Sequence, residues 1–67
     1  MSSINERAAE YQRLADEAGD KLEDQLARIR ADYGSRAITV REAADERVKV
    51  LEEHLARIQN LRDEYLG

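Results

Sequence analysis

The sequence predicts an all-α protein, an antiparallel two-helix hairpin of the coiled-coil type that we expect to dimerise into a four-helix bundle. Two long segments carry apolar residues at spacings of three, four or seven, a short stretch containing Gly34 and Thr39 separates them, and the chain contains no proline. The 67 residues form a single domain, 1–67. Within it we expect a first helix at about 4–33, a loop at 34–38 and a second helix at about 40–66.

The first helix has a start signal, an end signal and one weak point. Ser3 and Glu6 fit the S/T-x-x-E capping box, and Gly34 stands where a helix end favours positive φ. Gly19 is the weak point, because an interior glycine costs about 1 kcal/mol relative to alanine, and a break there would give a three-helix bundle. The apolar line keeps its phase through Gly19 and so favours one continuous helix. That line consists of Ile4, Ala8, Tyr11, Ala15, Ala18, Leu22, Leu26, Ile29 and Tyr33.

The second helix starts at a second capping box, Thr39 with Glu42, and carries two neighbouring apolar lines. We expect the first line to face the first helix, with Leu55 opposite Ala18, so that a large side chain meets a small one. The other line then lacks a partner in its own hairpin, which predicts a second copy and a four-helix bundle. The first line comprises Ala44, Val48, Leu51, Leu55, Ile58 and Tyr65, and the other comprises Val40, Ala43, Val50 and Leu61.

These lines define the residues that we expect to contact a second copy or another partner. His54 is the only histidine, and it is either an interface group or a half-buried side chain satisfied by a neighbour. Arg47 lies one heptad before His54, and polar groups at such positions often set register and oligomeric state. The expected interface consists of Leu14, Val40, Ala43, Arg47, Val50, His54, Leu61 and Tyr65.

The composition excludes several classes of site. With no cysteine and one histidine, neither a disulfide framework nor a usual zinc site is expected. Glu52, Glu53 and His54 do not form an H-E-x-x-H motif, and the sequence has no catalytic triad or phosphate-binding glycine loop. We therefore expect no enzyme activity, no catalytic residues, no cofactor and no metal. No apolar run approaches the roughly 18 residues needed to span a membrane, so we expect a cytoplasmic protein without membrane contact.

The leading functional hypothesis is a non-enzymatic protein–protein interaction module, a small accessory or regulatory protein whose partners are itself and an unidentified protein. The expected plan is similar in architecture to the Rop-type RNA-binding bundles, which implies the alternative of a nucleic-acid-binding four-helix bundle. The 15 acidic against 11 basic residues argue against that alternative. A further alternative is an acidic inhibitor that docks on a host or partner enzyme, of the kind that a phage or mobile element carries.

Overall fold

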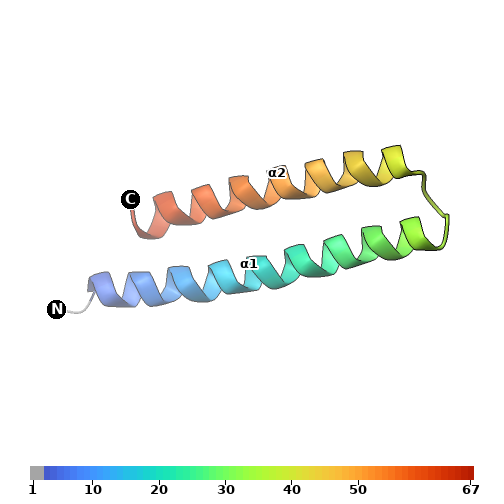
Figure 1. Ribbon diagram of the computed structural model, residues 1–67. Coiled ribbons are helices and arrows are strands. Elements are labelled where there is room, and N and C mark those ends of the chain that lie inside the picture. The colour runs from blue at the N-terminus through green and yellow to red at the C-terminus, as the bar shows by residue number, and fades with distance from the viewer. Residues whose placement is uncertain (1–2) are drawn as a thin grey trace.

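The protein is a two-helix hairpin, as the sequence predicts. The computed structural model describes residues 3–67, with helix α1 at Ser3–Gly34 and helix α2 at Val40–Tyr65. Figure 1 shows the helices antiparallel, with the connecting loop at one end and the start of α1 beside the end of α2 at the other. Since α1 continues through Gly19, the three-helix alternative is wrong.

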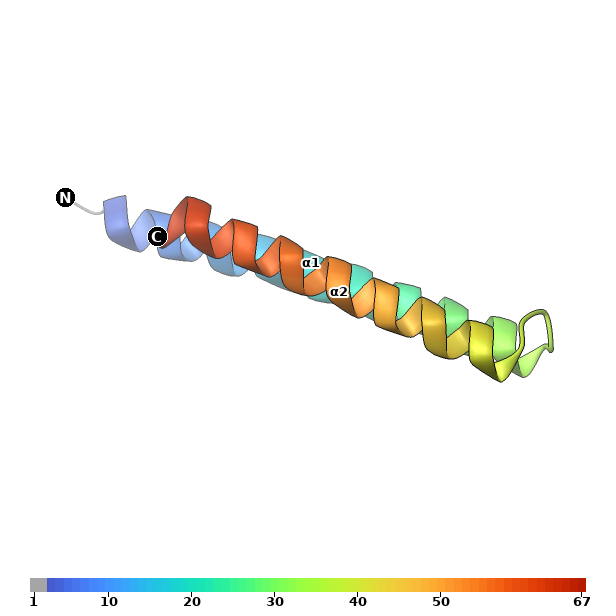
Figure 2. The ribbon, with the colours of Figure 1, turned by 90° about the horizontal axis from the view of Figure 1, so that it is seen from above.

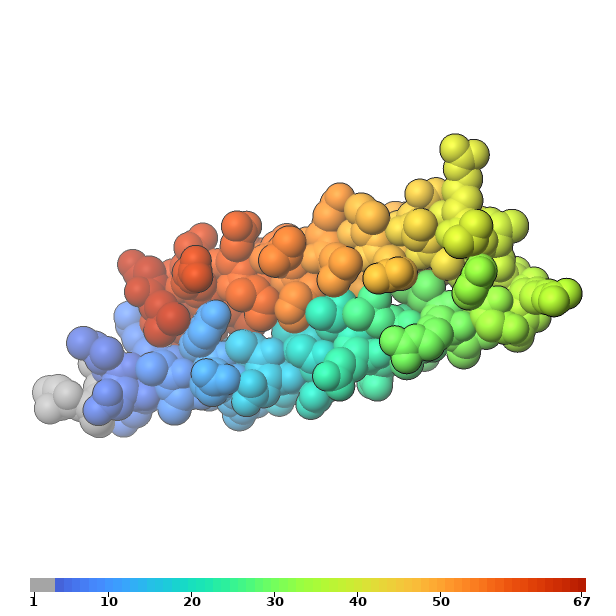
Figure 3. All heavy atoms as spheres, in the orientation of Figure 1, coloured from blue at the N-terminus to red at the C-terminus, as the bar shows by residue number. Residues whose placement is uncertain are grey.

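The hairpin is a single layer of two helices. Seen from above in Figure 2, α2 lies over α1 along most of its length, and the space-filling view in Figure 3 shows an elongated body. The Cα atoms extend over 55 × 16 × 8 Å, with a radius of gyration of 15.6 Å. A compact domain of this length has a radius of gyration of about 11 Å. Each helix therefore meets one neighbour and presents the rest of its surface outward.

The start of α2 is fixed by the capping box that the sequence predicts. The Glu42 backbone N–H donates to Thr39 Oγ1 at 3.1 Å, and the Thr39 backbone N–H donates to Glu42 Oε1 at 2.9 Å. Two amide groups that the helix leaves without partners are thereby satisfied. The other predicted box depends on the Ser3 side chain, which lies outside the described residues.

The end of α1 differs from the prediction at Gly34. Arg36, and not Gly34, adopts the left-handed conformation, with φ of 65°. The Ala37 N–H donates to the Asp32 carbonyl at 2.8 Å and the Arg36 N–H to the Tyr33 carbonyl at 3.1 Å, which is the Schellman pattern with Arg36 at C′. The Ser35 hydroxyl adds a bond to the Asp32 carbonyl. Gly34 is the last helical residue, so its placement as the C′ residue is wrong.

The contact between the helices uses the apolar line of α2 that was expected to face outward. Ala43 is buried with Ala18 and Ile29 of α1, and Val50 borders a groove with Ile29. Leu55, in contrast, is 62% exposed, so the prediction that it covers Ala18 is wrong. The middle parts of the two apolar lines have therefore exchanged places relative to the expectation, whereas Val40 is exposed and Ile58 and Tyr65 are half-buried.

The hairpin leaves much of its apolar surface in contact with water. Among residues 4–67 only Ala18, Ile29 and Ala43 are buried, and no side chain is completely enclosed. The accessible surface is 5531 Å², whereas a compact protein of this mass exposes about 4,300 Å². Against about 11,000 Å² for the unfolded chain, folding removes about half, compared with about 60% for small domains that fold alone.

Candidate protein interface

One side of the hairpin carries an apolar face built from both helices. On α2, Val40 is 67% exposed and Val48 is 55% exposed, and Leu51 and Leu55 continue the same stripe. We define the apolar face as the apolar residues on this side of the hairpin. They either line a shared hollow or continue from it along their helix at spacings of three, four or seven residues. They are Ala15, Gly19, Leu22, Leu26 and Tyr33 from α1, and Val40, Ala44, Val48, Leu51 and Leu55 from α2.

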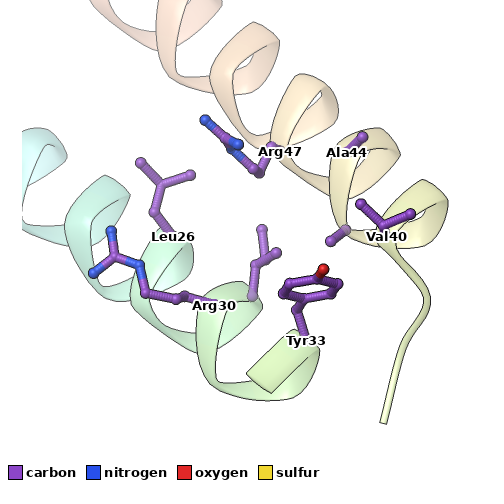
Figure 4. Close-up of a pocket in the computed structure, with 8 residues that line it drawn as sticks. Leu26, Arg30, Tyr33, Val40, Ala44 and Arg47 are labelled. Carbon is purple, nitrogen blue, oxygen red and sulfur yellow. The ribbon is translucent and has the colours of Figure 1, made fainter. Parts of the chain in front are cut away.

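A hollow at the loop end joins the two helices within this face. It has a volume of about 320 Å³, and its lining includes Leu26 and Tyr33 of α1 with Val40 and Ala44 of α2. The shared lining shows that the apolar stripes of the two helices lie on the same side of the hairpin. The Tyr33 ring lies at the end of the hollow nearest Val40 in Figure 4.

Two arginines border the hollow at its other end. Figure 4 shows the Leu26 side chain between the side chains of Arg30 and Arg47, one from each helix. Within residues 3–67 neither guanidinium makes a hydrogen bond or an ion pair. The hollow is therefore apolar at its floor and positively charged along one margin, which suits an apolar side chain followed by an acidic group.

The eight residues predicted to form the interface differ in how exposed they are in the structure. Val40 and Arg47 are exposed on the side that bears the apolar face. Leu14 and Leu61 border one groove between the helices, and Val50 borders another, so the facing helix already covers part of each of these side chains. Ala43 is buried, and His54 and Tyr65 are half-buried.

From the sequence, Val48, Leu51 and Leu55 are expected to pack against α1. Each is 40% exposed or more in the structure. Their regular spacing of three and four was the signal for an apolar contact surface, and only the direction of that surface was misjudged.

His54 is polar and lies within the apolar arc of α2. Its side chain is half-buried, and Nδ1 is enclosed without a hydrogen-bond partner among the described residues. Among residues 3–67, no group of three histidine or acidic side chains lies close enough together to hold a metal ion.

One cluster of ion pairs lies on α1, away from the apolar face. The Arg13 guanidinium pairs with Glu10, and its Nη1 lies 2.9 Å from Glu17 Oε1. The hydrogen bond from Arg13 lowers the pKa of Glu10, and the same bond with the charge of Glu10 raises the pKa of Arg13. Each of these side chains is at least 41% exposed, so the cluster contributes little to stability.

In comparisons with known proteins, no protein-family model, no curated protein and no solved structure matches the chain. Across residues 3–67, neither helix combines the length and apolar character needed to cross a membrane. The argument for function therefore depends on the apolar face.

Proposed function

We propose that this chain is a non-enzymatic protein-interaction module, a small accessory or regulatory protein that acts as a homodimer in the form of a four-helix bundle. The observation that carries the proposal is the exposure of Val40, Val48 and Leu55, each more than half accessible on one side of the hairpin. Apolar surface of this extent is unfavourable in water unless another surface covers it.

The area available on the hairpin supports a second copy as the cover. The chain exposes about 1,200 Å² more than a compact protein of its mass, and a standard interface buries about 800 Å² on each partner. A dimer would therefore bring the accessible surface of each chain close to that of a compact domain.

The layer structure supports the same conclusion. A single layer of two helices has two broad sides, and here one side is apolar. Two such layers stacked through their apolar sides form a four-helix bundle with one central core. The mixed acidic and basic side chains of the other side then remain outside, where they are free to dock on a further protein.

Sedimentation equilibrium tests the dimer directly. We expect wild-type protein at micromolar concentration to approach twice the 7.7 kDa mass of one chain. Val48→Glu should give the monomer mass, because it places a carboxylate within the covered face. Ala56→Glu is the matched control, since Ala56 is an exposed alanine of the same helix that lies outside the apolar face. A wild-type monomer, or equal effects of the two substitutions, would contradict the proposal.

A further inference from the structure

Gly19 has no packing role within a single copy of the hairpin. It lies in the middle of α1, where glycine is less favourable for a helix than alanine. A Cβ atom added there would meet nothing within 4 Å, so no close approach between α1 and α2 requires a glycine. Gly19 is one heptad before Leu26 and two before Tyr33, which places the empty space above it on the apolar face.

Leu55 lies on α2 at the same height along the hairpin as Gly19. Ile29 shares a hollow with Ala44, and Gln25 shares one with Val50. A residue of α1 and a residue of α2 at the same position along the long axis of the hairpin therefore have numbers that add to about 75. Leu55 is therefore level with Gly19 to within one helical turn. A large exposed side chain and a missing side chain thus occur side by side on one face: Leu55 is 62% exposed, and a Cβ atom at Gly19 would have nothing within 4 Å.

We propose that two copies pack face to face about a two-fold axis parallel to the long axis of the hairpin, with Leu55 of each copy over Gly19 of the other. This inference rests on the proposed homodimer and specifies its geometry. A rotation about such an axis keeps every residue at its own height, so α2 of one copy meets α1 of the other in the register that the hairpin already has. Both loops then lie at the same end of the bundle.

The rest of the apolar face fits this register. At matching heights Val40 meets Tyr33 of the second copy and Val48 meets Leu26, and the half-buried Ile58, at the edge of the apolar face, meets Ala15. Small residues thus oppose large ones in the half of the bundle near the termini, as interdigitated packing requires. Each α2 also lies antiparallel to the α1 that it contacts, which is the favourable arrangement of helix dipoles.

A two-fold axis perpendicular to the hairpin gives a poorer fit. It would place α2 of one copy over α2 of the other, running in opposite directions. With the two hairpins fully overlapped, Leu51 would face Arg62, and Val40 would project beyond the end of the partner helix. The most exposed part of the apolar face, near the loop, would then remain in water.

Distances between spin labels separate the two geometries. The chain has no cysteine, so Glu46→Cys and Glu53→Cys each provide a single labelling site per copy. Both residues are exposed and lie one heptad apart, pointing away from the apolar face. The parallel axis predicts nearly equal label–label distances at the two sites. The perpendicular axis changes the separation along the bundle by about 21 Å between the sites, and this result would overturn the inference.

Substitutions at the contact itself provide the second test. Gly19→Leu should weaken dimerisation roughly 100-fold, because it overpacks two symmetric contacts, while the open space around Gly19 lets the single hairpin keep its helicity. Adding Leu55→Ala should restore the affinity to within about tenfold of wild type, since the large and small side chains exchange places. Asp20→Leu is the control, an adjacent exposed residue about 100° around α1 from Gly19 and outside the apolar face, and should leave the dimer unchanged.

The outcomes separate this inference from the proposed function. A wild-type protein that remains monomeric refutes the homodimer and this geometry together. A wild-type dimer that tolerates Gly19→Leu, or that the Leu55→Ala exchange fails to restore, refutes the Gly19 contact and leaves the homodimer in place.

Discussion

Val50 and Leu51 are adjacent residues with opposite roles in the structure, and aspartate at each position gives the sharpest test of the fold. Val50 is half-buried in the groove beside Ile29, whereas Leu51 is 40% exposed on the apolar face. From the sequence, we expected Val50 to face a second copy and Leu51 to face α1. The two substitutions therefore distinguish the observed packing from the expected one.

The expected magnitudes follow from burial. Val50→Asp removes most of a contribution that reaches about 1.5–3 kcal/mol for a fully buried valine. It also brings a carboxylate into the groove, at about 1–3 kcal/mol if the charge finds no partner. The total is a large share of the roughly 3–10 kcal/mol available to a domain of this length. Leu51→Asp has a smaller effect on the single hairpin, because Leu51 is already 40% exposed and loses less burial, and the lower helix propensity of aspartate adds about 0.5 kcal/mol.

Thermal unfolding followed by circular dichroism, at concentrations where the wild type is monomeric, measures these effects. We expect Leu51→Asp to melt within a few degrees of the wild type, and Val50→Asp to melt lower by about 10 °C or more. At higher concentration the wild type should gain stability by dimerising, and Leu51→Asp should not. A Val50→Asp variant that melts like the wild type at low concentration would refute the assignment of the two lines.

Three further predictions test other parts of the molecule. Gly34→Ala should stabilise the hairpin by about 1 kcal/mol in chemical denaturation, because Gly34 is helical with space for a Cβ and Arg36 holds the left-handed position; destabilisation would contradict this description of the helix end. Arg13→Gln should raise the pKa of the Glu10 carboxyl toward its ordinary value in an NMR titration, because the hydrogen bond from Arg13 holds it low. The small stabilisation from this pair is present at pH values above the ordinary carboxyl pKa and is lost as the pH falls through the lowered pKa of Glu10. An unchanged Glu10 titration in Arg13→Gln would refute the pairing. A gel-shift assay at low salt should show no nucleic-acid binding at micromolar protein, whereas binding that weakens steeply with salt would favour the nucleic-acid alternative.

The two helices and their connection were predictable because their signals are local. Thr39 and Glu42 satisfy each other's backbone groups within one turn, so the start of α2 could be identified without knowledge of the rest of the chain. The end of α1 is less local. Hydrogen bonds to the Asp32 and Tyr33 carbonyls determine which residue turns left-handed, and Arg36 takes that position although glycine is the usual choice.

The direction of the apolar face was not predictable from the sequence. Apolar residues cover an arc of about 160° on α2, between the directions of Val50 and Val48. One neighbouring helix covers only part of such an arc. The part that it covers depends on the rotation of α2 about its own axis, which the turn through Arg36 sets. Periodicity shows that the arc exists, and the loop geometry determines how the arc is divided.

The distribution of large and small side chains explains why this division suits half of a bundle. Two of the three buried residues are alanines, Ala18 and Ala43, whereas Val48 and Leu55 remain exposed. For a hairpin that functions alone, burying alanines and exposing leucines is unfavourable, because a buried leucine contributes about 1.5–3 kcal/mol that an exposed one does not. In a four-helix bundle the same order is favourable. Small residues let neighbouring helices approach closely, and large ones fill the centre where all four helices meet. The hairpin therefore has the internal packing expected of one layer of a larger core, and in the proposed dimer the second layer covers its exposed leucines and valines.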